Sequence, residues 1–133
     1  MNIQLTSTKT LFLKLQPDQE ESIEEEKFSF DYQVEFPDSI KNKFIVVIKS
    51  LIEHKSGYHL DTIFLAEFQT DIEIDENFKT SKFPFVNAPA IAYPFFRSFI
   101  ANTLLNSGLE VIYLPAVNFE MLYKKKKEKS EQS

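Results

Sequence analysis

Residues 87–123 read NAPAIAYPFFRSFIANTLLNSGLEVIYLPAVNFEMLY, and they predict two helices joined by an extended connection. We expect the first helix to begin at Pro94, because the first turn of a helix does not need the amide hydrogen that proline lacks. Pro84 and Pro89 interrupt the pattern upstream, so no continuous helix is expected there. Apolar residues at helical spacing in the first helix predict packing against a sheet or a neighbouring subunit. They are Phe95, Phe96, Phe99, Ile100 and Leu104.

Signals for helix ends also occur on both sides of the connection. Gly108 suits the left-handed conformation that ends many helices, and Asn118 can cap the second helix. The residues after Tyr123 read KKKKEKSEQS, and this low-complexity charge predicts a disordered tail over 124–133. The preceding part, 1–123, is predicted to be a single domain.

The segments upstream show the alternation of β-strands. The strictest alternation covers 28–36, where polar residues separate an apolar set. That set is Phe28, Phe30, Tyr32, Val34 and Phe36. Weaker patterns cover 3–15 and 58–74, and 44–48 is apolar on both faces, which predicts an interior strand.

Polar links between these segments favour antiparallel pairing, because parallel pairing would need long crossovers. The glutamate-rich stretch 18–27 predicts a solvated connection. The sequence therefore predicts an α+β protein with a four-stranded antiparallel sheet and two helices packed on one face.

Composition excludes several classes of function. The chain has 15 Lys and Arg against 20 Asp and Glu, so it lacks the basic field of a nucleic-acid-binding protein. Its start has no secretory signal, and no apolar run approaches the ~20 residues that span a bilayer. With no cysteine, disulfides and thiolate metal sites are impossible. We expect a cytoplasmic protein that neither binds nucleic acid nor inserts into a membrane.

Few residues suggest catalysis. His54 and His59 flank a predicted turn, where exposed histidines are expected, although a metal or general-base role would be possible with further ligands. The carboxylates of 71–76 lack the spacing and glycine of a calcium loop. Two glycines leave no glycine-rich phosphate loop. We predict a protein that is not an enzyme and has no cofactor.

Three motifs resemble the SecB family of protein-export chaperones. Residues 93–97 (YPFFR) resemble the aromatic and proline start of the family's first long helix, and 114–120 (LPAVNFE) resemble its A-P-V-N-F-D stretch. Residues 65–68 (LAEF) are similar to its L-C-E-V stretch. The resemblance implies the same sheet with two helices that the spacing predicts.

It also implies a function, that of an ATP-independent holdase. Such a chaperone binds unfolded preproteins in apolar grooves and delivers them to the SecA translocation ATPase. The family assembles as a homotetramer, a dimer of dimers. The client-binding positions implied by the resemblance are Phe28, Phe30, Tyr32, Phe83, Phe85 and Tyr93. From the residues alone, the aromatic side chains of 28–32 could equally face the domain core.

Glu67 matches the family's acidic contact for the zinc-containing basic tail of the motor. Two further acidic contacts are expected near Thr10 and Lys14, and neither residue is acidic. SecB-like proteins also serve other clients, including the antitoxins of toxin–antitoxin systems. The alternative is therefore a chaperone or interaction protein for one dedicated partner.

Overall fold

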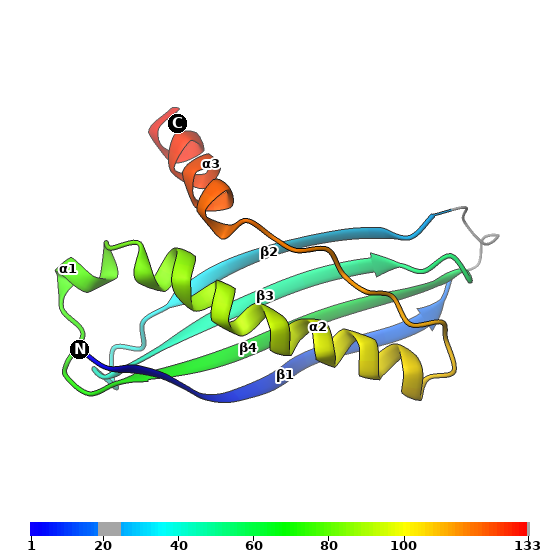
Figure 1. Cartoon of the computed structure of the whole chain (residues 1–133), viewed down its shortest axis with the longest axis horizontal. Helices are drawn as coiled ribbons and strands as arrows, with labels where there is room; N and C mark the ends of the chain where they lie inside the picture. Colours follow the sequence, from blue (N-terminus) through cyan, green and yellow to red (C-terminus); the bar gives the residue numbers. More distant parts are fainter. Residues whose placement is uncertain (19–24, 133) are drawn as a thin grey trace.

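The computed structural model describes residues 1–18 and 25–132, and its centre is a four-stranded sheet (Figure 1). The strands are β1 (Ile3–Pro17), β2 (Lys27–Glu35), β3 (Lys43–Glu53) and β4 (Tyr58–Thr70). They pair antiparallel in the order β1-β4-β3-β2, with β1 and β2 at the edges. The predicted α+β class and antiparallel sheet are confirmed. Most of the predicted glutamate-rich connection lies outside the described residues.

Helices follow the sheet in the chain. They are α1 (Glu76–Lys79), the π-helix η1 (Phe83–Asn87), α2 (Ala88–Asn106) and α3 (Phe119–Gln132). Figure 1 shows α2 and the extended connection to α3 lying across one face of the sheet, and α3 projecting beyond the edge strand β2. We call this the helix face of the sheet, and the opposite side the outer face.

The core lies between the helix face and α2. Phe44, Ile48 and Phe68 are fully buried, and so are Phe96 and Ile100 of α2. The predicted interior strand is β3, whose apolar residues over 44–48 are buried or half-buried on both faces, whereas Leu51 is 40% exposed. On the outer face the described residues include no helix, so the side chains there are covered only by their neighbours in the sheet.

The first long helix starts earlier than the sequence predicts. Instead of beginning at Pro94, α2 begins at Ala88 and follows η1 directly, with Pro94 inside the helix. The reason is the position of each proline. Pro84 and Pro89 occupy first-turn positions of η1 and α2, where few amides have helical partners, and Pro94 alone removes an interior hydrogen bond.

The predicted signals at both ends of the connection are confirmed. Gly108 has φ of 78°, and the amide of Leu109 donates to the carbonyl of Leu104 at 3.0 Å, which closes α2. At the start of α3, the amide of Met121 donates to Asn118 Oδ1 at 3.1 Å. The connection therefore leaves and enters helices at the predicted residues.

The lysine-rich tail differs from its prediction. It continues α3 as far as Gln132 instead of being irregular. Lysine and glutamate are good helix formers, and one lysine is tied to the sheet. Lys126 Nζ lies 2.7 Å from Asp31 Oδ1, donates to the carbonyl of Tyr32, and sits 4.2 Å from the centre of the Tyr32 ring.

His54 is not the exposed turn residue that the sequence predicts, because only 3% of its surface is accessible. Its Nε2 donates to the carbonyl of Glu110 at 2.8 Å, and its Nδ1 accepts the Ser56 amide at 3.1 Å. A carbonyl can only accept, so these bonds select the neutral ring with the proton on Nε2. His54 thus joins the β3–β4 turn to the connection before α3. His59 is half-buried, and its Nδ1 lies 3.8 Å from Asp18.

Candidate functional site

An aromatic cluster fills the space where β2, η1, α2 and the start of α3 meet. It consists of Phe28, Phe30, Tyr32, Phe85, Tyr93, Phe119 and Tyr123. Strand alternation places the β2 members on the helix face, and the π-helix and α2 supply the others. The cluster brings together five of the six client-binding positions that the resemblance implies.

Phe119 is the centre of the cluster. Its ring centroid lies 6.2 Å from that of Phe30, 5.3 Å from that of Tyr32 and 5.6 Å from that of Tyr93, in edge-to-face arrangements in each case. Such geometry is favourable for aromatic rings. Because Phe119 is the first residue of α3, the start of this helix is anchored in the cluster.

Two tyrosines of the cluster are structural in this arrangement. Tyr32 and Tyr93 are buried, and each hydroxyl donates to a backbone carbonyl at 2.7 Å, that of Phe85 for Tyr32 and that of Pro115 for Tyr93. Burial raises the pKa of Tyr32 to about 12 and also raises the pKa of Tyr93. Both side chains therefore belong to the domain core. For Tyr32, this is one of the two alternatives that the sequence leaves open for 28–32.

Four other cluster members, Phe28, Phe30, Phe85 and Tyr123, are only half-buried. Phe28 stacks on Phe30 with ring centroids 5.3 Å apart and planes 11° apart. Phe85 stacks on Tyr123 of α3 at 5.6 Å. These pairs leave apolar surface accessible along β2 and η1, which is the part of the cluster that can accept another apolar chain.

Phe83 lies away from this cluster. Its ring centroid is 6.1 Å from that of Phe78, which in turn is 5.6 Å from that of Phe44. It therefore belongs to a second aromatic group at the α1 end of the sheet. Phe119 and Tyr123, by contrast, belong to the first cluster although the sequence did not predict them as members. The signal was available, because both follow the predicted cap Asn118 at positions that share the packed side of α3.

Ion pairs hold α3 beside the cluster. The hydrogen bond from Lys126 lowers the pKa of Asp31, and Lys82 Nζ lies 3.0 Å from Glu120 Oε1 and lowers the pKa of Glu120. Both pairs are largely exposed, so each contributes little to stability. Their effect is to set the position of α3 against β2 and η1.

Glu67, the implied motor contact, lies on the outer face and is already partnered. Its carboxylate accepts from Lys43 Nζ at 3.1 Å and from Ser7 Oγ at 3.0 Å, and these two hydrogen bonds lower its pKa. Thr10 pairs with Phe64 and so lies on the helix face, whereas Lys14 pairs with Asp61. Of these two further positions, Thr10 therefore lies on the opposite face from Glu67, and Lys14 places a base on the outer face.

Neither metal binding nor membrane insertion has support among residues 1–18 and 25–132. No group of three or more His, Asp or Glu side chains in this part of the chain is placed to hold a metal ion. Within the same residues, none of the helices is both long and apolar enough to cross a bilayer. What the site offers is apolar surface with a charged border.

Similarity to known proteins agrees with this geometry. A similar solved structure is the SecB-like chaperone Rv1957 of Mycobacterium tuberculosis, in complex with a ChAD peptide from the Rv1956 HigA1 antitoxin. It has a TM-score of 0.68 and 14% identity, and the alignment covers 86% of this chain and 89% of that chain. A protein of unknown function from Streptococcus agalactiae aligns with a TM-score of 0.49 and 9% identity, over 87% of this chain and 98% of that chain.

No sequence among curated proteins matches this chain. The family model described as preprotein translocase subunit SecB, however, matches residues 7–130, which include most of β1, all of β2, β3 and β4, and the helices through most of α3. The family match supports a chaperone role, and the likeness to the SecB-like chaperone shows the same fold. The chain belongs to the SecB family.

Proposed function

We propose that this chain is an ATP-independent holdase that binds unfolded preproteins through the accessible part of the aromatic cluster. The observation that carries the proposal is the half-buried pair Phe28 and Phe30 on the edge strand β2, together with the half-buried Phe85 of η1. An unfolded chain can cover these rings without any chemistry, and catalysis is not part of the proposal.

The energetics suit a chaperone with many clients. Covering apolar surface contributes roughly 25 cal/mol per Å² whatever the sequence of the client, so any segment with apolar side chains gains affinity. Aromatic rings add area with few rotatable bonds to restrict. We infer that clients share apolar content and not a fixed motif.

The proposal extends to assembly and delivery. We propose a cytoplasmic homotetramer, a dimer of dimers, in which several grooves bind one long client. Support comes from exposed apolar residues on α2, a surface that suits a subunit contact. These are Ile91, Phe95 and Leu105. Delivery to the SecA translocation ATPase would use Glu67 on the outer face.

A second candidate function is a chaperone for one dedicated partner, such as an antitoxin. The pairing of Glu67 with Lys43 favours it, because a partnered carboxylate attracts a basic tail less strongly. The solved complex of the SecB-like chaperone with an antitoxin peptide shows that a protein of this fold binds such a partner. Binding to many unrelated unfolded proteins separates the holdase from this alternative.

The groove is tested by replacing Phe28 and Phe30 together with serine and measuring binding to a reduced, unfolded precursor by fluorescence anisotropy. Losing two partly covered rings should weaken binding roughly tenfold to a hundredfold, while circular dichroism shows an intact fold. The matched control is Ile72→Ser, an exposed apolar residue outside the cluster. Unchanged binding in the double variant, or no aggregation suppression by the wild type, contradicts the proposal.

Delivery is tested by two substitutions with opposite expected effects. Glu67→Lys should weaken binding of the motor's basic tail in calorimetry, and Lys43→Gln should strengthen it by releasing the carboxylate. If neither substitution changes the affinity, Glu67 is not the contact. Recovery of a single folded partner by pull-down, with no binding to unfolded precursors, would support the dedicated chaperone instead.

A further inference from the structure

The aromatic cluster has a basic border on the side of α3. Lysines outnumber carboxylates in α3, although the whole chain has a formal net charge of −5. Lys124, Lys125, Lys127 and Lys129 are all exposed. The positive charge is therefore concentrated on the one helix that begins inside the cluster.

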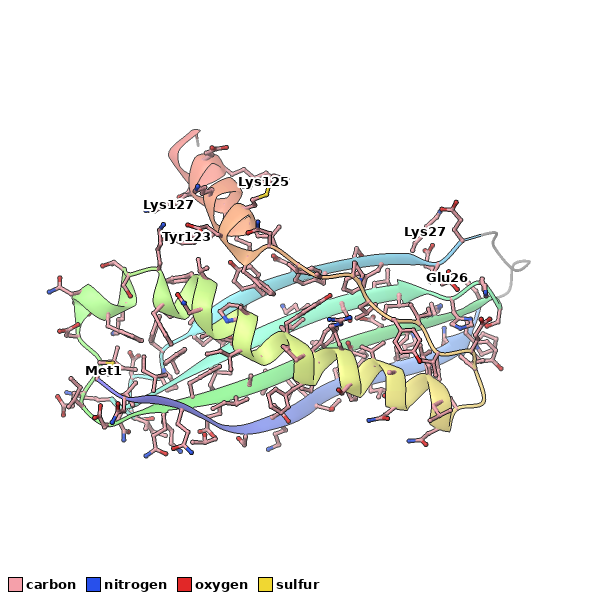
Figure 2. The ribbon with its side chains drawn as sticks, in the orientation of Figure 1. Met1, Glu26, Lys27, Tyr123, Lys125 and Lys127 are labelled. Atoms are coloured by element: carbon pink, nitrogen blue, oxygen red, sulfur yellow. The ribbon has the colours of Figure 1, made fainter. Side chains whose placement is uncertain are left out.

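Helical spacing arranges these lysines in two columns that lead away from the cluster. Residues four apart lie on the same side of a helix, so Met121 is followed by Lys125 and Lys129, and Tyr123 by Lys127. Figure 2 shows Lys125 on the opposite side of α3 from Tyr123 and Lys127. Each column begins with an apolar or aromatic side chain and ends in positive charge.

The first side chain of one column contacts the aromatic cluster, and the first side chain of the other column is exposed. Tyr123 stacks on Phe85, and Lys127 Nζ lies 5.3 Å from the centre of the Tyr123 ring. Met121 is 54% exposed. A peptide that covers these side chains would lead directly onto the lysines.

Carboxylates near the cluster do not cancel this charge, because they are already paired. Asp31 lies 2.7 Å from Lys126, and Glu120 lies 3.0 Å from Lys82. Glu128 is the nearest further carboxylate along α3, and five lysines lie within four residues of it. The exposed border of the cluster on the α3 side is thus basic.

We propose that this chain selects client segments in which aromatic or aliphatic residues are followed by acidic residues. The apolar part covers Phe28, Phe30 and Phe85, and the carboxylates lie along α3 within the positive field of its exposed lysines. This inference rests on the proposed holdase function and adds a client class to it. Attraction between exposed charges acts mainly on encounter and is screened by salt, so the preference is salt-dependent.

An acidic peptide fits better than a broad anionic surface. The lysines border the accessible apolar part of the cluster, which a peptide with both kinds of residue can cover. A membrane or a nucleic acid would present its negative charge to a chain that is acidic overall, and most of its surface would be repelled. Binding to such surfaces is therefore an outcome that would contradict the proposal.

The test uses fluorescent peptides that share one aromatic core and differ in a flank of glutamate, glutamine or lysine. With the full-length chain, anisotropy at about 0.05 M salt should show roughly tenfold tighter binding of the glutamate-flanked peptide than of the lysine-flanked one. The difference should shrink to roughly twofold or less at about 0.5 M salt. The variant Lys125→Gln, Lys127→Gln, Lys129→Gln should lose the preference and keep its affinity for the glutamine-flanked peptide.

The matched control removes the same charge from the outer face, with Lys9→Gln, Lys14→Gln and Lys49→Gln, and should keep the preference. Equal affinity of the wild type for all three peptides overturns the inference but leaves the holdase proposal intact. Failure to bind any of them overturns the holdase proposal itself. Lysine-dependent binding to phosphatidylserine vesicles or single-stranded DNA, without a preference among peptides, overturns the inference in favour of an anionic surface.

Discussion

Replacing Phe119 with alanine should release α3 from the domain without unfolding the sheet. Phe119 is 3% exposed and contacts three other rings, so the substitution removes most of the apolar surface that the start of α3 buries. A buried phenylalanine covers about 150–250 Å², which at about 25 cal/mol per Å² gives an upper estimate of about 4–6 kcal/mol. Buried Phe to Ala substitutions typically cost about 3–5 kcal/mol.

This loss should appear in α3 and not in the sheet. The helix is joined to the domain through an extended connection, and its other contacts include the packing of Leu122, an aromatic stack, and the exposed ion pairs and hydrogen bond of its charged residues. A cost of about 3–5 kcal/mol raises the population of the released helix by a factor of roughly a hundred to a few thousand. Amide hydrogen exchange followed by mass spectrometry measures this factor for each segment.

We expect faster exchange in α3 and in 109–118, with unchanged exchange in β3 and β4. The control is Tyr113→Ala on the same connection, where the side chain is 83% exposed and should contribute little. Two results would contradict the predicted release of α3. One is wild-type protection of α3 in the Phe119 variant, and the other is an equal loss of protection in the sheet, which would mean that α3 and the sheet unfold as one unit.

Three further predictions concern single residues. The pKa of Tyr32 is about 12 in the folded state against an ordinary 10.0, so its contribution to the free energy of unfolding is present below pH 10 and is lost as the pH rises through 12. Tyr32→Phe should therefore flatten the decline of the free energy of unfolding with pH, measured by urea titrations at successive pH values. His54→Asn keeps an acceptor for the Ser56 amide but loses the bond to the connection, so it should lower the free energy of unfolding by about 1 kcal/mol, whereas His59→Asn should change it little. Gly108→Ala should lower the free energy of unfolding by about 1 kcal/mol in denaturant titration. The loss comes from the positive φ alone, because an added Cβ meets no atom within 4 Å. An unchanged free energy of unfolding would show that the turn relaxes.

Local periodicity accounts for the parts of the fold that the sequence predicts well. The alternation of 28–36 predicts β2 because side chains on a strand point to opposite faces whatever lies beyond it, and the structure buries Tyr32 while Asp31 and Gln33 stay exposed. Gly108 and Asn118 were predictable for a similar reason. A left-handed turn and a side-chain cap depend on a few neighbouring residues, which the sequence lists in order.

The predictions that failed depend on contacts between distant residues. Pro94 lies inside α2 because packing of η1 and α2 on the core compensates for one missing hydrogen bond. His54 is buried because the carbonyl of a residue 56 positions away in the sequence accepts a hydrogen bond from its ring. No local sequence pattern shows that these two residues meet. The same holds for Lys126, which reaches Asp31 from a segment that resembles a disordered tail.

For the candidate site, the sequence by itself determined that aromatic residues line one side of β2 and stand near the starts of two helices. Only the tertiary structure decided which of them are accessible. Tyr32 and Tyr93 are buried because Phe119 packs onto them and backbone carbonyls accept hydrogen bonds from their hydroxyls. Phe28 and Phe30 stay half-buried at the sheet edge. Accessibility is a property of what covers a side chain, and the residues that cover this strand come from the far end of the chain.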